Sequence, residues 1–219
     1  MSDQLILKFP TNEVYLKEDF YVSSSNKEAY EFVNSWPKWI KNIANIFGPP
    51  GSGKTHLASI LKSKTSTLEV QSDALNDKIF FEFKTKEALI IENLNEKISE
   101  NLLFSLWNVT LQDNKYLLIT STKPINVYKF KLPDLKSRVS SSVTIGINLP
   151  SDDLISVILA KNFSDKQIKV EKKHIDYIIK RIDRSYEKIS QFISILDKYS
   201  LKKGNPFGLK LIKEVLKMI

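Results

Sequence analysis

The chain has 219 residues, of which 42% are hydrophobic, and it carries a formal net charge of +8 at pH 7. Such a length suits one large domain or two small ones. The absence of cysteine excludes disulfides and cysteine-based metal centres and fits a reducing compartment. The chain shows no apolar run of membrane-spanning length and no signal-peptide pattern. We therefore expect a cytoplasmic protein with no membrane partner.

An extended leader over 1–22 is followed by an amphipathic helical pattern over 28–36. Strand-like apolar runs then alternate with helical patterns up to Pro150. This alternation predicts an α/β fold over 23–150, in which helices cover a parallel sheet. The expected strands are 43–47, 66–70, 88–91, 116–121 and 143–147, and the clearest helices are 55–64 and 98–112. The segment 73–86 fits either a helix or a strand.

Beyond Pro150 the pattern is helical throughout, which predicts a C-terminal all-α segment over 151–219. The expected helices are 153–162, 174–182, 185–199 and 206–217. This segment holds 15 Lys/Arg against 9 Asp/Glu. A basic segment can attract nucleic acid or an acidic protein, and the alternative is a lysine-rich solvated surface.

The stretch GPPGSGKT at 48–55 has the spacing G-x-x-x-x-G-K-T of a phosphate-binding P-loop. An apolar strand pattern precedes it and a helical pattern follows, which argues against a glycine turn that binds nothing. Glycines let backbone N–H groups surround phosphates, and the helix N-terminus favours an anion. We expect nucleotide contacts from Gly48, Pro50, Gly51, Ser52, Gly53, Lys54, Thr55 and His56, with the Thr55 hydroxyl on Mg²⁺.

An acidic residue should end a neighbouring strand and hold the water shell of the Mg²⁺ ion. Glu92 ends the expected strand 88–91 and is the candidate, unless it is a plain surface charge. The next residue is Asn93, whose amide cannot take a proton from water, so intrinsic ATP hydrolysis should be slow. Glu96 is a substitute base only if its loop folds back.

The strand 116–121 ends in hydroxyls, so Ser121 or Thr122 is a candidate contact to the γ-phosphate or the attacking water. Two arginines, Arg138 and Arg184, follow in polar segments. Taken alone, each fits an ordinary surface ion pair.

In combination and in order, these blocks resemble the AAA+ ATPases of the DnaA initiator clade, and within it the short Hda-type regulators. The resemblance covers nearly the whole chain. The matching blocks are an adenine-binding box (Asp19, Phe20, Tyr21, Val22, Ser25, Asn26 and Ala29), Walker A (48–58), Walker B (89–93), sensor 1 (Ser121 and Thr122), an arginine-finger box (132–138) and sensor 2 (181–185).

The resemblance implies an AAA+ P-loop core with a C-terminal helical lid that binds ATP or ADP with Mg²⁺. Phe20, Val22 and Asn26 would contact the adenine. Arg138 would be an arginine finger that acts in trans on nucleotide held by the DnaA initiator, and Arg184 would contact nucleotide in its own subunit. Glu92 stands where the clade usually has Asp, and Asn93 replaces a second carboxylate, so weak autonomous turnover is expected.

The chain ends at Ile219, where initiators continue into a DNA-binding domain, so we expect DNA contact to be indirect or weak. At the other end, Leu5, Leu7 and Phe9 share one face of an extended chain and follow Gln4. This pattern resembles the peptide with which Hda-type proteins dock into the DNA polymerase sliding clamp. The alternative is an edge strand on this protein's own core. Self-association into a homo-oligomer stays open.

Two other functions remain open. A helicase loader or a transposition-type ATPase of the same clade would self-assemble on single-stranded DNA and hydrolyse ATP itself. A small-molecule kinase also uses a P-loop, although the arginine-finger box and the helical lid argue against it.

Overall fold

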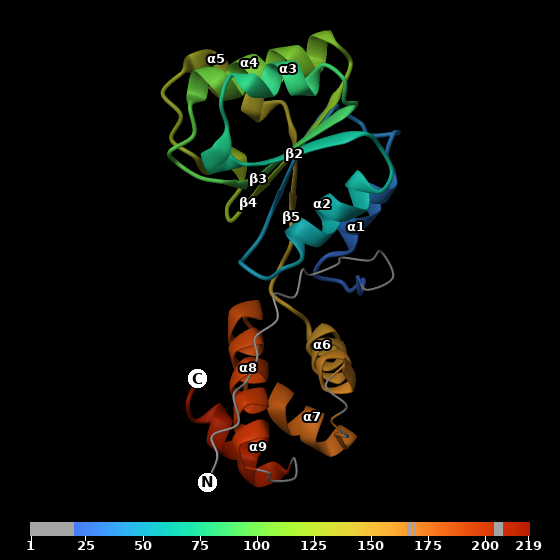
Figure 1. Ribbon diagram of the computed structural model, residues 1–219, viewed down its shortest axis with the longest axis vertical. Helices are drawn as coiled ribbons and strands as arrows, with labels where there is room; N and C mark the ends of the chain where they lie inside the picture. The colour runs from blue at the N-terminus through green and yellow to red at the C-terminus, as the bar shows by residue number, and fades with distance from the viewer. Residues whose placement is uncertain (1–19, 166–167, 169, 204–207) are drawn as a thin grey trace.

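The computed structural model describes residues 20–165, 168, 170–203 and 208–219, and the side chains of these residues other than 200–203. A five-stranded sheet forms the first part, in the order β2-β3-β4-β1-β5, with every neighbouring pair parallel (Figure 1). The strands are β1 (Ile43–Phe47), β2 (Thr67–Gln71), β3 (Ala88–Leu94), β4 (Tyr116–Ser121) and β5 (Val143–Gly146). This confirms the predicted α/β core.

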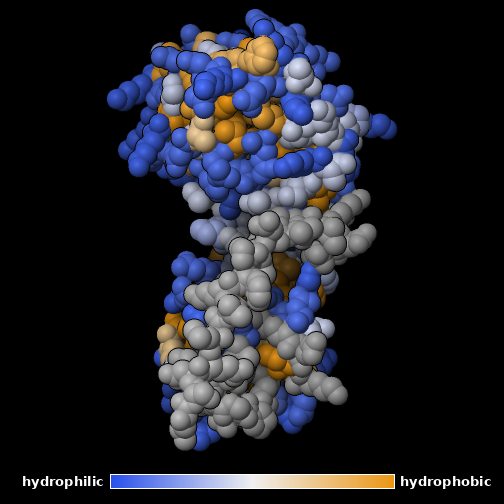
Figure 2. Space-filling view, viewed as in Figure 1, coloured by the Kyte–Doolittle hydropathy of each residue, from blue (hydrophilic) through white to orange (hydrophobic). Residues whose placement is uncertain are grey.

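Helices cover both faces of the sheet (Figure 1). One face carries α1 (Lys27–Asn34) and α2 (Lys54–Lys62), and the other carries α3 (Lys78–Phe83), α4 (Glu100–Gln112) and α5 (Pro133–Ser140). The described residues of this part also form two short 3₁₀ turns, Ser72–Ala74 and Ile125–Val127. Figure 2 shows hydrophilic side chains over most of the outer surface of α3, α4 and α5, with hydrophobic ones visible between them.

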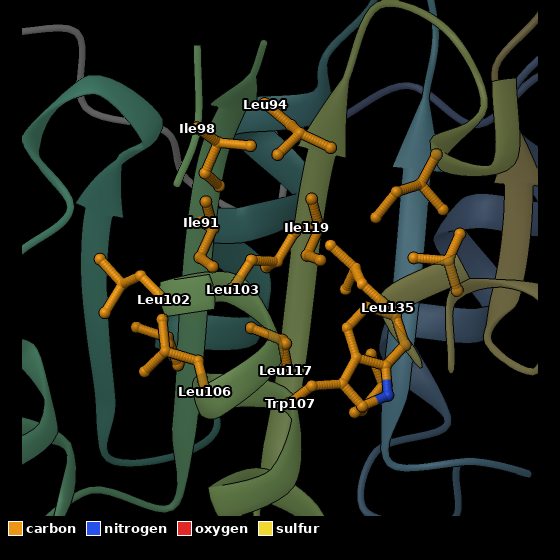
Figure 3. Packing of buried hydrophobic residues seen from close by; sticks show 14 of the residues in the cluster. Ile91, Leu94, Ile98, Leu102, Leu103, Leu106, Trp107, Leu117, Ile119 and Leu135 are labelled. Atoms are coloured by element: carbon orange, nitrogen blue, oxygen red, sulfur yellow. The ribbon is translucent and has the colours of Figure 1, made fainter. Parts of the chain in front are cut away.

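The central strands are buried on both faces because their side chains alternate between two apolar clusters. Leu89 and Ile91 of β3 pack with Leu103 of α4, whereas Ile90 packs in the cluster beneath α1 and α2. Figure 3 shows Ile91 and Leu103 meeting Ile119 of β4 between the sheet and the helix. This double-sided core holds the carboxyl ends of β1, β3 and β4 in fixed register.

Among the described residues, four helices follow the sheet: α6 (Asp152–Asp165), α7 (Lys172–Ile179), α8 (Tyr186–Lys203) and α9 (Leu209–Leu216). They pack around an apolar cluster of their own, which includes Ile155, Phe192 and Ile212. In Figure 1 they lie together beyond the carboxyl edge of the sheet. The described part of the chain after Pro150 is therefore helical, as predicted. None of the described helices is both long and apolar enough to cross a membrane.

Strand β3 and helix α5 differ from the sequence-based expectations, and the segment 73–86, which was left open, is now assigned. Strand β3 does not end at Glu92 but continues to Leu94, because the pairing with β4 shifts register between Ile91 and Leu94. The segment that fitted either a helix or a strand contains α3. Helix α5 was not predicted, since only two of its eight residues, Leu135 and Val139, are buried and its apolar pattern is short.

Candidate functional site

The loop between β1 and α2 turns through two residues in the left-handed region. Gly51 has φ = 77° and Gly53 has φ = 91°, conformations that glycine adopts without a Cβ penalty. No described side chain caps α2, so the N–H groups of its first turn remain available to an anion. A cavity of about 500 Å³ opens here, lined by residues 50–56 and Asn93. The loop therefore has the backbone of a phosphate site.

Lys54 lies at the centre of this loop and is only 8% exposed. Its Nζ donates to the carbonyl oxygens of Gly48 at 2.8 Å and Pro49 at 2.9 Å. Burial lowers the pKa of Lys54 from its ordinary 10.5, and the negative charge of Glu92 opposes that shift. An anion bound in the cavity would compensate the burial of this cation.

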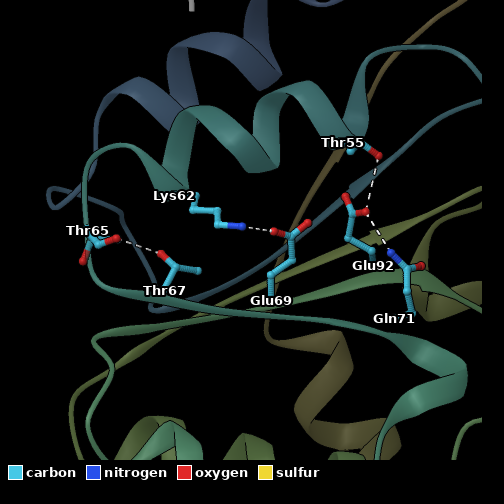
Figure 4. A network of polar contacts seen from close by, with 7 residues as sticks. All are labelled: Thr55, Lys62, Thr65, Thr67, Glu69, Gln71 and Glu92. Carbon is cyan, nitrogen blue, oxygen red and sulfur yellow. Dashed lines mark hydrogen bonds and ion pairs between the residues drawn. The ribbon is translucent and has the colours of Figure 1, made fainter. Parts of the chain in front are cut away.

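Glu92 is a buried carboxylate, 2% exposed, and not a surface charge. Its Oε2 accepts hydrogen bonds from Thr55 Oγ1 at 3.4 Å and from Gln71 Nε2 at 3.2 Å (Figure 4). Its Oε1 has no hydrogen-bond partner among the described residues. A hydroxyl and a carboxylate with a spare oxygen form the hard oxygen set that Mg²⁺ prefers, so these residues fit the metal that a P-loop nucleotide carries.

Asn93 follows in the left-handed region, with φ = 56°, at the register shift in β3. Its backbone N–H donates to Thr120 Oγ1 at 3.1 Å, and its Nδ2 donates to Gln71 Oε1 at 2.8 Å. The side chain is thus held at the edge of the P-loop cavity, where an amide can orient water but cannot accept its proton. Glu96 does not line that cavity and pairs with Lys123 at 2.7 Å.

No family model matches the sequence. The replication initiator DnaA of Campylobacter jejuni (serotype O:6, strain 81116) is 27% identical over 233 residues, which cover 94% of this chain and 53% of that protein. The chain therefore spans about half the length of the curated relatives it matches. This chain is homologous to DnaA. The homology supports the DnaA-related AAA+ family, within which an Hda-type subgroup is not resolved.

The fold agrees with this relationship. Domain III of Thermotoga maritima DnaA superposes with a TM-score of 0.77 at 20% identity, covering 96% of this chain and 98% of that one. The AMPPCP-bound DnaA of Aquifex aeolicus superposes with a TM-score of 0.71 at 20% identity, covering 91% and 69%. The parallel sheet with flanking helices and a C-terminal helical segment is thus the AAA+ fold of DnaA.

Of the residues expected to contact adenine, Phe20 lies against the phosphate loop. Its ring stacks on Tyr30, with centroids 5.4 Å apart, meets the edge of His56 at 5.1 Å, and lies against Gly53. Val22 is exposed. Asn26 is buried and bonds its own loop: Oδ1 accepts from the N–H of Ser23, and Nδ2 donates to the carbonyl of Tyr21. Asn26 thus supports the loop before α1 and is not among the residues that line the P-loop cavity.

The two expected γ-phosphate contacts at the end of β4, Ser121 and Thr122, lie in different surroundings. The Ser121 hydroxyl is buried, accepts a hydrogen bond from Asn45 Nδ2 at 2.8 Å and donates to the carbonyl of Lys123 at 2.8 Å. It is therefore engaged inside the protein. Thr122 is exposed, and Thr120, which sequence reasoning did not single out, holds the backbone of Asn93.

The two arginines lie in different surroundings. Arg138 is exposed in the last turn of α5 and forms no ion pair with another described residue. Arg184 pairs with Asp152 at 3.0 Å, at the start of α6. Neither lines the P-loop cavity. The expected clamp-binding residues Gln4, Leu5, Leu7 and Phe9 lie outside the described part of the chain.

The helix that carries Arg138 is fixed by Glu100 at the start of α4. Its carboxylate accepts the backbone N–H groups of Lys131 and Leu132, at 2.8 and 2.7 Å. Both hydrogen bonds lower the pKa of Glu100 from its ordinary 4.5, and the one from Leu132 has the larger effect. The ionised carboxylate therefore orients the segment that leads into α5.

We predict that this contact contributes stability that depends on pH. Because the pKa of Glu100 is lower in the folded chain, its contribution is present above pH 4.5 and is lost as the pH falls through the folded pKa. In Glu100→Gln, the free energy of unfolding should therefore depend less on pH in this acidic range. Urea denaturation at a series of pH values measures this dependence. Glu82→Gln, an exposed glutamate on α3, is the control and should leave it unchanged. Identical profiles for wild type and Glu100→Gln would refute the assignment.

Besides Thr120, two further residues of the site, Gln71 and Tyr186, escaped sequence reasoning because they are remote along the chain. Gln71 bonds both Glu92 and Asn93 from β2, which only the strand order reveals. Tyr186 of α8 lies against Gly51. A polar residue at the carboxyl end of an apolar strand was a usable signal for Gln71, while Tyr186 had none.

Proposed function

We propose that this chain binds ATP or ADP with Mg²⁺ at the P-loop and acts in the bacterial cytoplasm as an Hda-type regulator of replication initiation. The observation that supports nucleotide binding most strongly is the left-handed glycine loop around buried Lys54, with Thr55 and Glu92 beside it. Homology to DnaA and the fold of AMPPCP-bound DnaA support an adenine nucleotide. The nucleotide would lie between the core 23–150 and the lid 151–219.

Within this proposal, catalysis takes place mainly on the partner. Asn93 lines the chain's own nucleotide cavity, where hydrolysis needs a base that takes a proton from water. Its amide cannot act as that base, so intrinsic ATP hydrolysis is weak. Arg138 projects from α5 into solvent without an ion pair to another described residue, as an arginine that serves a neighbouring molecule must. We propose that it reaches ATP held by the DnaA initiator and neutralises charge that develops on the transferred phosphoryl group.

We further propose that the chain docks on the sliding clamp through residues 4–9. Alternate apolar side chains at Leu5, Leu7 and Phe9 suit insertion into a hydrophobic groove, with Gln4 as the polar anchor. A clamp loaded on DNA would bring the chain to the replication fork, so the contact with DNA is indirect.

A pull-down with purified clamp tests the docking step. Replacing Leu7 and Phe9 together with alanine should weaken clamp binding by about 100-fold or more, since burial of each side chain contributes about 1.5–3 kcal/mol. The matched control is Lys8→Ala, because Lys8 lies between them and points to the opposite side of an extended peptide. Equal clamp binding by all three proteins would refute docking through this segment.

A self-assembling ATPase of the same clade, such as a helicase loader, is the second candidate. It is favoured by the excess of basic residues after Pro150, where 15 Lys/Arg face 9 Asp/Glu. Single-stranded DNA alone should then stimulate ATP hydrolysis by this chain. Under the first proposal, hydrolysis responds to the initiator and the clamp, and DNA alone has no effect.

A further inference from the structure

Tyr186 is the first residue of α8, and it is packed directly against the phosphate loop. It is only 7% exposed. A Cβ atom built on Gly51 would lie 3.1 Å from the Cβ of Tyr186, so the two backbones approach as closely as glycine allows. Gly51 also has φ = 77°. The left-handed backbone and the close approach of Tyr186 therefore both favour glycine at this position.

The hydroxyl of Tyr186 ties the same side chain to a third segment. It donates to the carbonyl oxygen of Asn148 at 3.2 Å, in the connection between β5 and α6. The N–H of Asn148 in turn donates to the carbonyl of Ser25, just before α1, at 2.9 Å. Burial raises the pKa of Tyr186 above its ordinary 10.0. One side chain therefore joins the phosphate loop, the connection between β5 and α6, and helix α8.

The neighbouring arginine does not make this connection. Arg184 precedes Tyr186 by two residues, is largely exposed, and pairs with Asp152 of α6 within the helical segment. In this structure α8 therefore touches the phosphate loop through its first residue, Tyr186. A displacement of α8 would remove the side chain from Gly51, expose its ring to water and break the bond to Asn148.

We propose that Tyr186 couples occupancy of the phosphate loop to the position of helices α6–α9. The inference rests on the nucleotide binding proposed above and adds the path by which the helical segment responds to it. A nucleotide that holds Gly51 in its left-handed turn also holds the surface on which Tyr186 packs. By linkage, a lid fixed by Tyr186 favours the loop that binds nucleotide. Tyr186 is thus a positioning residue and does not itself touch the phosphates.

Hydrogen exchange of the full chain, with and without ADP and Mg²⁺, tests the coupling. At ADP concentrations about 100 times the dissociation constant, amides of residues 186–193 in the wild type should gain up to about 100-fold protection, because opening of α8 then competes with ligand binding. In Tyr186→Leu the P-loop still binds ADP, but the protection gained in this segment should fall below about threefold. Undiminished ADP-dependent protection in Tyr186→Leu would overturn the proposal.

A second pair of variants isolates the hydroxyl. Tyr186→Phe keeps the ring on Gly51 and loses the bond to Asn148, so it should retain part of the ADP-dependent protection. Tyr128→Phe is the matched control: Tyr128 is also 7% exposed and donates to a backbone carbonyl, that of Leu94 at 2.8 Å, but it lies in the core beneath α4 and α5. It should retain all of the protection.

The outcomes separate the coupling from the function on which it rests. Calorimetry that detects no ADP binding by the wild type would overturn both. ADP binding without added protection of residues 186–193 would overturn the coupling alone. Thermal unfolding of Tyr186→Leu shows whether the helical segment stays folded. If it does not, the phenylalanine variants decide: a partial loss of the protection in Tyr186→Phe but not in Tyr128→Phe supports the coupling, and equal, full retention in both overturns it.

Discussion

Replacing Lys54 with alanine should weaken ADP binding by about 100-fold, because a hydrogen bond to a charged group contributes about 1.5–3 kcal/mol. Lys54 is the buried cation of the loop, and the carbonyl oxygens of Gly48 and Pro49 hold its Nζ beside the cavity. A bound phosphate would replace these two carbonyl oxygens as the hydrogen-bond acceptor of Lys54 Nζ. Because the phosphate is negatively charged, it is a stronger acceptor than they are. Isothermal titration calorimetry with ADP and Mg²⁺ measures the change directly.

The matched control for this prediction lies on the same helix. Lys62→Ala removes a lysine from the last turn of α2, where the side chain is 54% exposed and pairs with Glu69 at 2.7 Å. It should leave ADP affinity unchanged. Because Lys54 also bonds the loop backbone, thermal unfolding of Lys54→Ala without ligand must show a folded protein. Wild-type affinity in a folded Lys54→Ala variant would contradict the assignment of this loop as the nucleotide site.

Arg138→Ala should abolish most of the acceleration that this chain gives to ATP hydrolysis by the DnaA initiator. An arginine supplied in trans increases phosphoryl-transfer rates by about 10³–10⁵ in other systems, so a loss of at least about 10³-fold is expected if Arg138 acts in this way. The side chain is exposed on α5 and does not line the chain's own P-loop cavity. The same variant should therefore bind ADP with wild-type affinity. Phosphate release from ATP-loaded initiator, with clamp on DNA, gives the rate.

Two companion variants sharpen the test of the finger. Lys136→Ala removes another exposed cation from α5 and should leave the stimulation intact, which excludes a general effect of charge. Arg138→Lys keeps the charge but loses the planar fork that binds two phosphate oxygens, so it should restore only part of the rate. Full stimulation of the initiator by Arg138→Ala would refute the finger role.

The sheet was predictable because buried parallel strands leave continuous apolar runs in the sequence. The bounds of β1 and β4 agree with the predicted 43–47 and 116–121. The end of β3 was not predictable, since the register shift after Ile91 depends on its pairing with β4 and on the left-handed Asn93. Short α5 also escaped prediction, because a helix that buries two side chains leaves little periodic signal.

The site was predictable where its chemistry is local. The P-loop spacing fixed the place of Lys54 and Thr55, since glycines and lysine must follow one another along a single turn. Contacts between segments that are far apart in the sequence could not be predicted. The amide of Gln71 joins Glu92 and Asn93 only because β2 lies beside β3, and the engagement of the Ser121 hydroxyl depends on Asn45 across β1 and β4.

The unpartnered Oε1 of Glu92 bears on which form of the ligand the protein accepts. Without a divalent ion, polyphosphate bound near Thr55 would bring its negative charge close to a buried carboxylate, and the two anions would repel each other in a medium that screens them poorly. With a divalent cation between them, the carboxylate and the phosphate are both attracted to the cation, and the repulsion is offset. If the loop binds nucleotide as proposed, the pocket should therefore prefer the chelated nucleotide over the bare one, because Glu92 Oε1 has no hydrogen-bond partner among the described residues and is free to face a bound cation.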